Sequence, residues 1–296
     1  MDEKSVCIVK ELHGVKQHIR AYFDTIFSNV KKWELVYWWI LRGLMIFALI
    51  DTLVRGRNYN GSNPPIQIAA NLVGMFAYEI IQLFPKKSRL RLFSPRFQNI
   101  TALGFLLGSF GGAYLNLYYI LPMYDKILHA TGTAEGVYIG YEFVCATQLK
   151  LKKTCPPQIA ALCALGFGFL LANGWELFEF TYDQFFGGDA QHWNLALALE
   201  EAGGNWRNIF QMFPVRDYEI FRMRFSLMDT MADIVMNCVG GGIMYVVLRL
   251  FPYRHRGAGD INRMIEASEK AAQQAQEALT SDADAAYNAR ERSVIS

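Results

Sequence analysis

Residues 173–183 read Asn173-Gly174-Trp175-Glu176-Leu177-Phe178-Glu179-Phe180-Thr181-Tyr182-Asp183. They close an apolar run that begins near Ile159 and is long enough to cross a bilayer. Glu176, Glu179 and Asp183 are spaced so that they lie roughly on one face of a helix. A charged side chain costs about 2.5–3.5 kcal/mol at the centre of a membrane helix, so acids in such a run are candidate functional residues.

Five further apolar runs have the length of membrane helices, and the sequence therefore predicts an all-α, polytopic transmembrane bundle. The hydrophobic content of 52%, with 24 glycines and 21 phenylalanines, suits such helices. The six predicted spans cover residues 36–54, 64–84, 99–121, 125–149, 157–180 and 227–250. The expected organisation is a polar N-terminal arm (1–35), a six-helix membrane domain (36–251) with a long loop at about 181–226, and a tail (252–296) that is partly helical with a disordered end.

The composition also argues against several other classes of protein. The net charge of +2 is too balanced for a nucleic-acid-binding protein, and no motif for binding RNA or DNA is present. The five cysteines include no CxxC pair, so neither a disulfide framework nor a cysteine zinc site is indicated. The first 30 residues are charged and contain no early apolar segment, so no signal peptide is expected.

The distribution of Lys and Arg predicts the orientation of the spans. The N-terminal arm, the loops at 85–98 and 150–156 and the segment after the sixth span are basic, whereas the loops at 55–63 and 122–124 are not. Basic loops stay in the cytoplasm, which predicts a multi-pass protein of the cell membrane with both termini cytoplasmic. The fifth span then ends, and the fourth and sixth begin, on the non-cytoplasmic side.

Polar residues gather at these three helix ends. The fourth span begins Asp125-Lys126-Ile127-Leu128-His129, and the sixth contains Asp229-Thr230-Met231-Ala232-Asp233, with Asn237 one turn further on. We expect the three ends to meet at one depth and to form a carboxylate–histidine site. The candidate metal ligands are Asp125, His129, Glu176, Glu179, Asp229 and Asp233. The further candidate ligand-binding residues are Asp183, Asn237, Glu142 and Tyr114, in addition to Asp125.

The cluster admits three interpretations from sequence. Its acids can pair with Lys126, His129 or loop arginines such as Arg207, Arg222 and Arg224, which would make it structural. They can hold a divalent metal and act on a lipid head group or a lipid-linked phosphate, with His129, Glu176 and Glu179 as catalytic residues. In this case His129 can also serve as a general base.

The third interpretation is proton- or cation-coupled transport, in which Glu135 and Glu142 continue a path inward from the cluster. The sequence does not decide among the three, nor does it identify the oligomeric state or a bound metal.

Two features elsewhere predict packing. Glycines recur every four residues in the third span (104, 108, 112) and in the fourth (132, 136, 140), which predicts that these two spans pack closely as a hairpin. Arg42 lies inside the limits of the first span, where we expect its side chain to snorkel towards the membrane surface.

The order of the motifs resembles the VanZ-like group of bacterial membrane proteins, and its YjdF-like branch in particular. The resemblance covers about residues 100–250. The motifs that carry it are Gly111-Gly112-Ala113-Tyr114, Tyr124-Asp125-Lys126-Ile127-Leu128-His129, Glu142, Trp175-Glu176-Leu177-Phe178-Glu179 and Asp229-Thr230-Met231-Ala232-Asp233. Distant VanZ members are linked to glycopeptide (teicoplanin) resistance, so the resemblance implies a role in the cell envelope.

One departure from this group concerns a Gln-Gly-Asp tripeptide, which usually stands just before the Asp-Thr motif. This chain instead has Gly188-Asp189-Ala190-Gln191-His192 far earlier, with a long insertion between the two motifs. The role of the tripeptide is therefore expected to be lost or rearranged here.

Overall fold

The computed structural model describes residues 20, 23–24, 30–56, 64–85, 87–121, 123–186, 190–191, 225–251, 270 and 273–274. Within these residues the chain is all-helical and has no strand, which confirms the all-α part of the prediction. Most of the predicted N-terminal arm, of the 181–226 loop and of the tail lies outside them. The elements are α2 (Lys32–Arg55), α3 (Pro64–Gly74), α4 (Ala77–Gln82), the 3-10 turn η1 (Leu90–Leu92), α5 (Pro95–Phe105), the π-helical segment η2 (Leu106–Tyr114), α6 (Leu117–Ile120), α7 (Tyr124–Leu151), α8 (Pro157–Phe186) and α12 (Phe225–Leu250).

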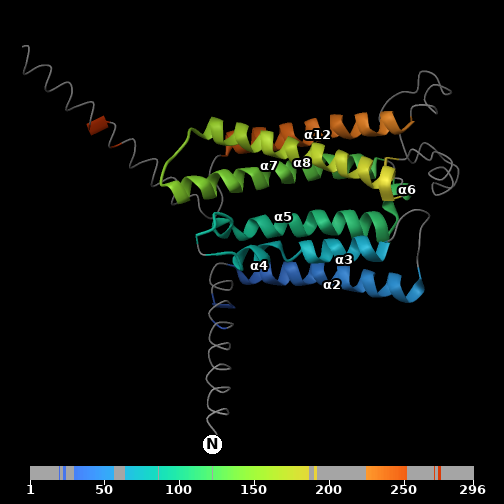
Figure 1. The fold of residues 1–296 in the computed structure, drawn as a ribbon. Helices are drawn as coiled ribbons and strands as arrows, with labels where there is room; N and C mark the ends of the chain where they lie inside the picture. Colours follow the sequence, from blue (N-terminus) through green and yellow to red (C-terminus); the bar gives the residue numbers. More distant parts are fainter. Residues whose placement is uncertain are drawn as a thin grey trace, which may run out of the picture.

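The helices lie side by side with roughly parallel axes, in two groups (Figure 1). One group contains α7, α8 and α12, which pack extensively on one another. The other contains α2, α3, α4, α5 and η2, and α7 is packed against α5, η1 and η2. The starts of α7 and α12 and the end of α8 therefore lie at the same end of the bundle, which we call the acidic end.

Three described helices are long and apolar enough to cross a membrane: Lys32–Arg55, Pro157–Phe185 and Phe225–Leu250. Large apolar side chains on all three remain exposed, among them Leu53, Val54, Leu170, Phe185, Ile243 and Leu250. Water-soluble proteins rarely expose such extensive apolar faces, whereas contact with lipid explains them.

The other three predicted spans are built differently. The helix α7 has 28 residues and is therefore about 42 Å long, enough to cross a bilayer, but its five Asp, Glu and Lys residues and its histidine lower its hydropathy. Residues 64–84 and 99–121 are divided among shorter helical segments. The structure thus supports a helical membrane protein, while six spans with cytoplasmic termini stay a prediction.

The break between α3 and α4 explains the buried Arg42. Its Nε and Nη2 donate to the backbone carbonyl of Met75 at 3.1 and 2.7 Å, and Nη2 also donates to Glu79 at 2.6 Å. The Gln98 amide donates to the same carbonyl, which lies where the helix is interrupted. Arg42 is only 1% exposed, so the prediction that it snorkels to the surface is wrong. Its charge instead satisfies a carbonyl and a carboxylate within the bundle.

The third and fourth predicted spans do lie against each other, since α5 and η2 contact α7, but most of their glycines do not form this contact. Gly136 of α7 faces α8, where an added Cβ would lie 3.4 Å from Gly168. Gly112 of η2 instead makes room for the ring of Tyr118. The spacing predicted close approach correctly, but the rotation of α7 about its axis selects α8 as the partner.

Candidate functional site

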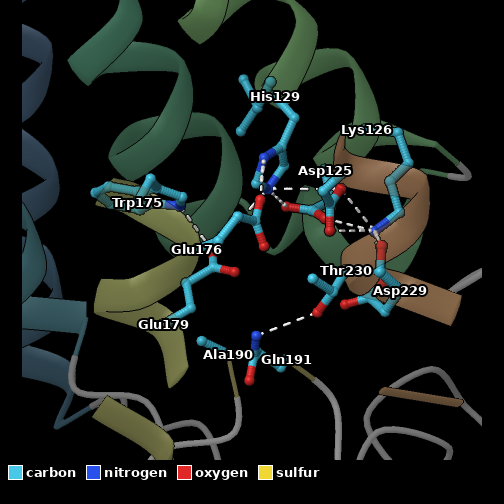
Figure 2. A network of polar contacts seen from close by, with 12 residues as sticks. Asp125, Lys126, His129, Trp175, Glu176, Glu179, Ala190, Gln191, Asp229 and Thr230 are labelled. Atoms are coloured by element: carbon cyan, nitrogen blue, oxygen red, sulfur yellow. Dashed lines mark hydrogen bonds and ion pairs between the residues drawn. The ribbon is translucent and has the colours of Figure 1, made fainter. Parts of the chain in front are cut away.

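Three helix ends supply the polar side chains at the acidic end of the bundle. Asp125, Lys126 and His129 come from the first turns of α7, Glu176 and Glu179 from the last turns of α8, and Asp229 and Asp233 from the first turns of α12. Figure 2 shows that the labelled side chains point toward one another across the three helices. All six predicted metal ligands are therefore brought into one cluster, which we call the His129 cluster.

Lys126 is the hub of one half of the cluster. Its Nζ lies 3.0 Å from Asp125 Oδ2, 2.5 Å from Asp229 Oδ1 and 2.8 Å from Asp233 Oδ1, and its side chain is 2% exposed. A buried ammonium among three carboxylates is strongly attracted to them, and its pairing offsets the cost of removing these charges from water. This half of the cluster agrees with the structural interpretation, in which the acids pair with Lys126.

His129 lies between this half and the two glutamates of α8. Its Nδ1 is 3.3 Å from Glu176 Oε1. Its Nε2 lies 3.7 Å from Asp125 Oδ1, 3.6 Å from Asp233 Oδ1 and 4.0 Å from Glu179 Oε1. The imidazole is therefore surrounded by carboxylate oxygens at distances longer than a good hydrogen bond.

Glu176 is the least satisfied member of the cluster. Its residue is 8% exposed, and neither carboxylate oxygen has a hydrogen-bond partner in the described part of the chain. Glu179 accepts a hydrogen bond from Trp175 Nε1 at 2.7 Å. Lys126 is the one Lys or Arg that the described residues place in this cluster, and no ion pair joins it to either glutamate. The loop arginines considered from sequence lie outside the described residues.

Two sets of residues have the composition and spacing of metal sites. Asp125, His129 and Asp233 form one set, and His129, Glu176 and Glu179 form the other. In each set, one ligand atom per residue lies within 4.8 Å of the others. Adjacent ligands of one ion at about 2.1 Å lie about 3.0–3.4 Å apart, so the Nδ1–Oε1 distance of 3.3 Å already fits a shared ion.

Asp183 closes the outer edge of the cluster without joining it. Its carboxylate accepts from the backbone N–H groups of Ala190 and Gln191 at 2.7 and 2.9 Å. The Gln191 amide in turn donates to Thr230 Oγ1 of α12 at 3.1 Å (Figure 2). Asp183 therefore connects the turn at 190–191 to α8, and Gln191 connects the same turn to α12.

The remaining predicted binding residues are distributed over three places. Asn237 lies deeper on α12, and its Oδ1 accepts from Thr133 Oγ1 of α7 at 2.6 Å. Tyr114 packs in the other helix group, where its hydroxyl donates to Asp51 at 3.0 Å. Glu142 lies towards the opposite end of α7 and accepts from the backbone N–H and the hydroxyl of Ser94 at 3.0 and 2.6 Å. Neither Tyr114 nor Glu142 belongs to the His129 cluster.

A cavity of about 340 Å³ adjoins the cluster between the two helix groups. His129 and Trp175 line it beside the cluster, and Glu135 lines it further along α7. Its remaining wall is largely apolar, with residues from α3, α5, η2, α6, α7, α8 and α12. Pockets of this size and composition hold small molecules or parts of larger ligands.

Sequence reasoning named Lys126 as one possible partner of the acids but not as the hub that joins three of them. It missed the roles of Trp175 and Glu135 as cavity walls and of Gln191 as a link to α12. Lys126 carried a signal, because a lysine beside an acid in the first turn of a membrane helix needs several acidic partners. Gln191 carried none, since its partner Thr230 is 39 residues away.

A family model described as "Predicted membrane protein (DUF2238)" matches residues 37–254, which is more than half of the chain. None of the curated proteins and none of the solved structures matches the chain. The match confirms the coarser part of the prediction made from the motifs, a family of membrane proteins. The VanZ-like and YjdF-like assignment stays a prediction.

Proposed function

We propose that this chain, which belongs to the DUF2238 family of predicted membrane proteins, binds a divalent metal ion at His129, Glu176 and Glu179. The bound ion would act on the phosphate group in the head of a membrane lipid. The lipid is an envelope lipid or a lipid-linked phosphate. The single observation that carries the proposal is Glu176, a buried carboxylate that lies 3.3 Å from His129 Nδ1 and whose two oxygens have no hydrogen-bond partner among the described residues.

The charge balance of the cluster supports this assignment. The described residues place five carboxylates and one lysine in the cluster, and among these residues the lysine forms ion pairs with the three aspartates but with neither glutamate. The two glutamates are left with a histidine between them, and like charges held this close repel each other unless a cation or protons intervene. A divalent ion between His129, Glu176 and Glu179 would neutralise both glutamates.

The types of ligand atom in the site indicate which metal ions it would bind and what chemistry the ion would supply. Oxygen-rich sites with one imidazole suit Mn²⁺, Fe²⁺ or Zn²⁺, whereas sites with oxygen ligands alone suit Mg²⁺ or Ca²⁺. Such an ion can polarise a phosphoryl oxygen or activate a water molecule. Asp125 and Asp233, already paired with Lys126, would orient His129 from its Nε2 side.

Location supports the choice of lipid as substrate. The cluster lies at one end of helices that are apolar enough to cross a membrane, so its level is that of the lipid head groups. We further propose that this end is non-cytoplasmic, in a six-span protein of the cell membrane with both termini in the cytoplasm.

The metal proposal is tested by thermal unfolding of the purified full-length protein after treatment with a chelator. Mn²⁺, Zn²⁺, Fe²⁺ and Mg²⁺ are added one at a time, and at least one should raise the unfolding temperature because it binds the folded state alone. His129→Ala should remove this rise, whereas Thr52→Ala, whose hydroxyl donates within α2, should keep it. If no ion shifts the unfolding temperature and elemental analysis finds no bound metal, the proposal fails. The pairing of the acids with Lys126 and with loop arginines would then be the leading interpretation.

Orientation is tested by cysteine labelling in intact cells. Ser62→Cys should react with a membrane-impermeant thiol reagent from outside, and Ser88→Cys should react only after the membrane is opened. Equal labelling of both positions from outside would contradict the proposed topology.

One observation favours a second candidate function, cation- or proton-coupled transport. Glu135 lines the cavity about 9 Å along α7 from His129, where a carboxyl group could relay protons or bind cations. The proposed continuation through Glu142 has no support, because Ser94 and Tyr138 already donate to that carboxylate. Ion uptake into proteoliposomes that is lost in Glu135→Gln would favour transport over lipid chemistry.

A further inference from the structure

The cavity beside the His129 cluster is longer and larger than a bound metal ion alone would need. It holds about 340 Å³ and runs along α7 from His129 past Glu135 to Ile139. These eleven residues of α7 cover about 15 Å of helix. A phosphate bound at the cluster would occupy only the end of such a space, so the rest is available to another part of the same ligand.

The wall of the cavity is suited to a hydrocarbon chain. Phe105 of α5, Leu128 and Ile139 of α7 and Leu171 of α8 supply apolar side chains to it. Polar residues also line it, namely Gln67, Asn71, Thr131, Thr133, Glu135 and Asn237; of these, Asn71 already donates to Ser109 and Thr133 to Asn237, each at 2.6 Å. Burial of each methylene group in such a site is favourable, and an apolar wall offers nothing to a free inorganic ion.

The cavity also reaches the surface that faces lipid. Leu171 and Trp175 line it, and they are 44% and 52% exposed on α8. The same helix is one of those apolar enough to cross a membrane. A lipid chain can therefore pass from the bilayer into the cavity along α8 without crossing water.

We propose that this cavity binds the hydrocarbon chain of an amphiphile whose phosphate head is held at the His129 cluster. The inference rests on the proposed function for the position of the head and assigns a separate site to the chain. The substrate class is accordingly a phosphate monoester or diester with at least one long apolar chain, and water-soluble phosphates are excluded as good ligands.

Two glycines provide variants that fill the cavity. Gly132 of α7 lines it and has no atom within 4 Å of an added Cβ, and Gly108 of η2 lines it from the other helix group, with Tyr118 Oη at 4.0 Å as its nearest neighbour. Gly132→Leu and Gly108→Leu should therefore occupy the space of the chain at little steric cost. Gly166→Leu in α8 is the matched control, because Gly166 also has nothing within 4 Å and is not among the cavity residues.

The experiment uses full-length protein in nanodiscs of phosphatidylcholine and a monododecyl phosphate with a diazirine on its chain. After illumination, mass spectrometry should map the cross-links to the cavity wall at Leu171 and Ile139. Gly132→Leu and Gly108→Leu should each lower this cross-linking about tenfold, the loss expected when roughly two methylene groups leave an apolar site. Gly166→Leu should leave it unchanged.

The result that overturns the inference is cross-linking spread over the lipid-facing helices and equal in the parent and in both filled variants. Inorganic phosphate in excess should compete weakly, whereas unlabelled monododecyl phosphate should compete fully. Strong competition by inorganic phosphate would also count against a chain site. The metal-induced rise in unfolding temperature is measured in the same variants and should persist in Gly132→Leu. Absence of cavity labelling in the parent protein with an intact metal response refutes the chain site alone, and cavity labelling of the parent without any metal response refutes the metal proposal alone.

Discussion

Glu142 and Glu176 are both buried glutamates in long membrane-type helices, yet their surroundings differ. Glu142 accepts hydrogen bonds from the Ser94 backbone N–H, from the Ser94 hydroxyl and from the Tyr138 hydroxyl at 3.0, 2.6 and 2.8 Å. Glu176 faces His129 and has no hydrogen-bond partner within the described residues. A satisfied buried acid fixes one chain segment against another, whereas an unsatisfied one leaves binding capacity for a ligand.

The contrast extends to the regions that the two acids occupy. Ser94 precedes α5, so Glu142 holds the start of that helix against α7. Glu176 lies in a cluster where the described residues supply five carboxylates and one lysine. Among the described residues, buried charge is thus used for packing at one end of the bundle and exceeds its compensation at the other. The following variants test this difference, from the largest expected effect to the smallest.

Lys126→Met should be the most destabilising change. It leaves Asp125, Asp229 and Asp233 without their shared cation, and removal of one partner from a buried ion pair costs about 3–5 kcal/mol. Thermal unfolding of the metal-free protein measures the loss. The addition of Asp229→Asn and Asp233→Asn to this variant should recover much of it, and a Lys126→Met protein as stable as the parent would show that these acids are held in another way.

Glu176→Gln should separate stability from binding. The metal-free variant should unfold at the parent temperature or above it, because no hydrogen bond is lost and one buried charge is removed. The stabilisation by metal should disappear, which at a hundredfold excess over Kd amounts to about 2.7 kcal/mol. Thermal unfolding measured with and without the ion that stabilises the parent gives both the stability of the metal-free variant and its stabilisation by metal. A Glu176→Gln protein that is less stable but still stabilised by metal would show that Glu176 serves packing and not metal binding.

Glu142→Gln should show the opposite behaviour. The amide keeps one acceptor oxygen but places an NH₂ group where Ser94 or Tyr138 donates, which costs about 1–3 kcal/mol. The rise in unfolding temperature on addition of metal should stay as in the parent. Comparison of the two glutamine variants in one assay makes each the control of the other, and loss of metal binding in Glu142→Gln would connect the two regions.

Asp183→Asn should have the smallest effect. The asparagine oxygen can still accept from one of the two backbone N–H groups at residues 190 and 191, so the loss is about 1 kcal/mol. Metal binding should be unaffected, because the Asp183 carboxylate is taken up by this turn. Protease digestion under native conditions measures the loosening of the turn, with Thr181→Ala, whose hydroxyl donates to the Leu177 carbonyl of α8, as the control.

Local properties of the sequence were enough to predict much of this protein. The length of an apolar run and the spacing of its charges depend on neighbouring residues, and they predicted the helical class, the helices α2, α7, α8 and α12, and the acids at three helix ends. Side chains three, four and seven residues apart share a face of any helix, so the candidate ligands within each helix could be found without a structure.

The tertiary structure alone decided how these helices use their polar residues. The break after α3 depends on Arg42 and Gln98, which are 33 and 23 residues from the carbonyl that they share. The partner of the α7 glycines depends on helix rotation, and the partner of Glu142 lies 48 residues away. Such contacts follow from how whole helices rotate and pack, which no local pattern encodes. For that reason the sequence placed Glu142 and Glu176 in one functional set, and only the fold showed that Glu142 accepts three hydrogen bonds while Glu176 accepts none from the described residues.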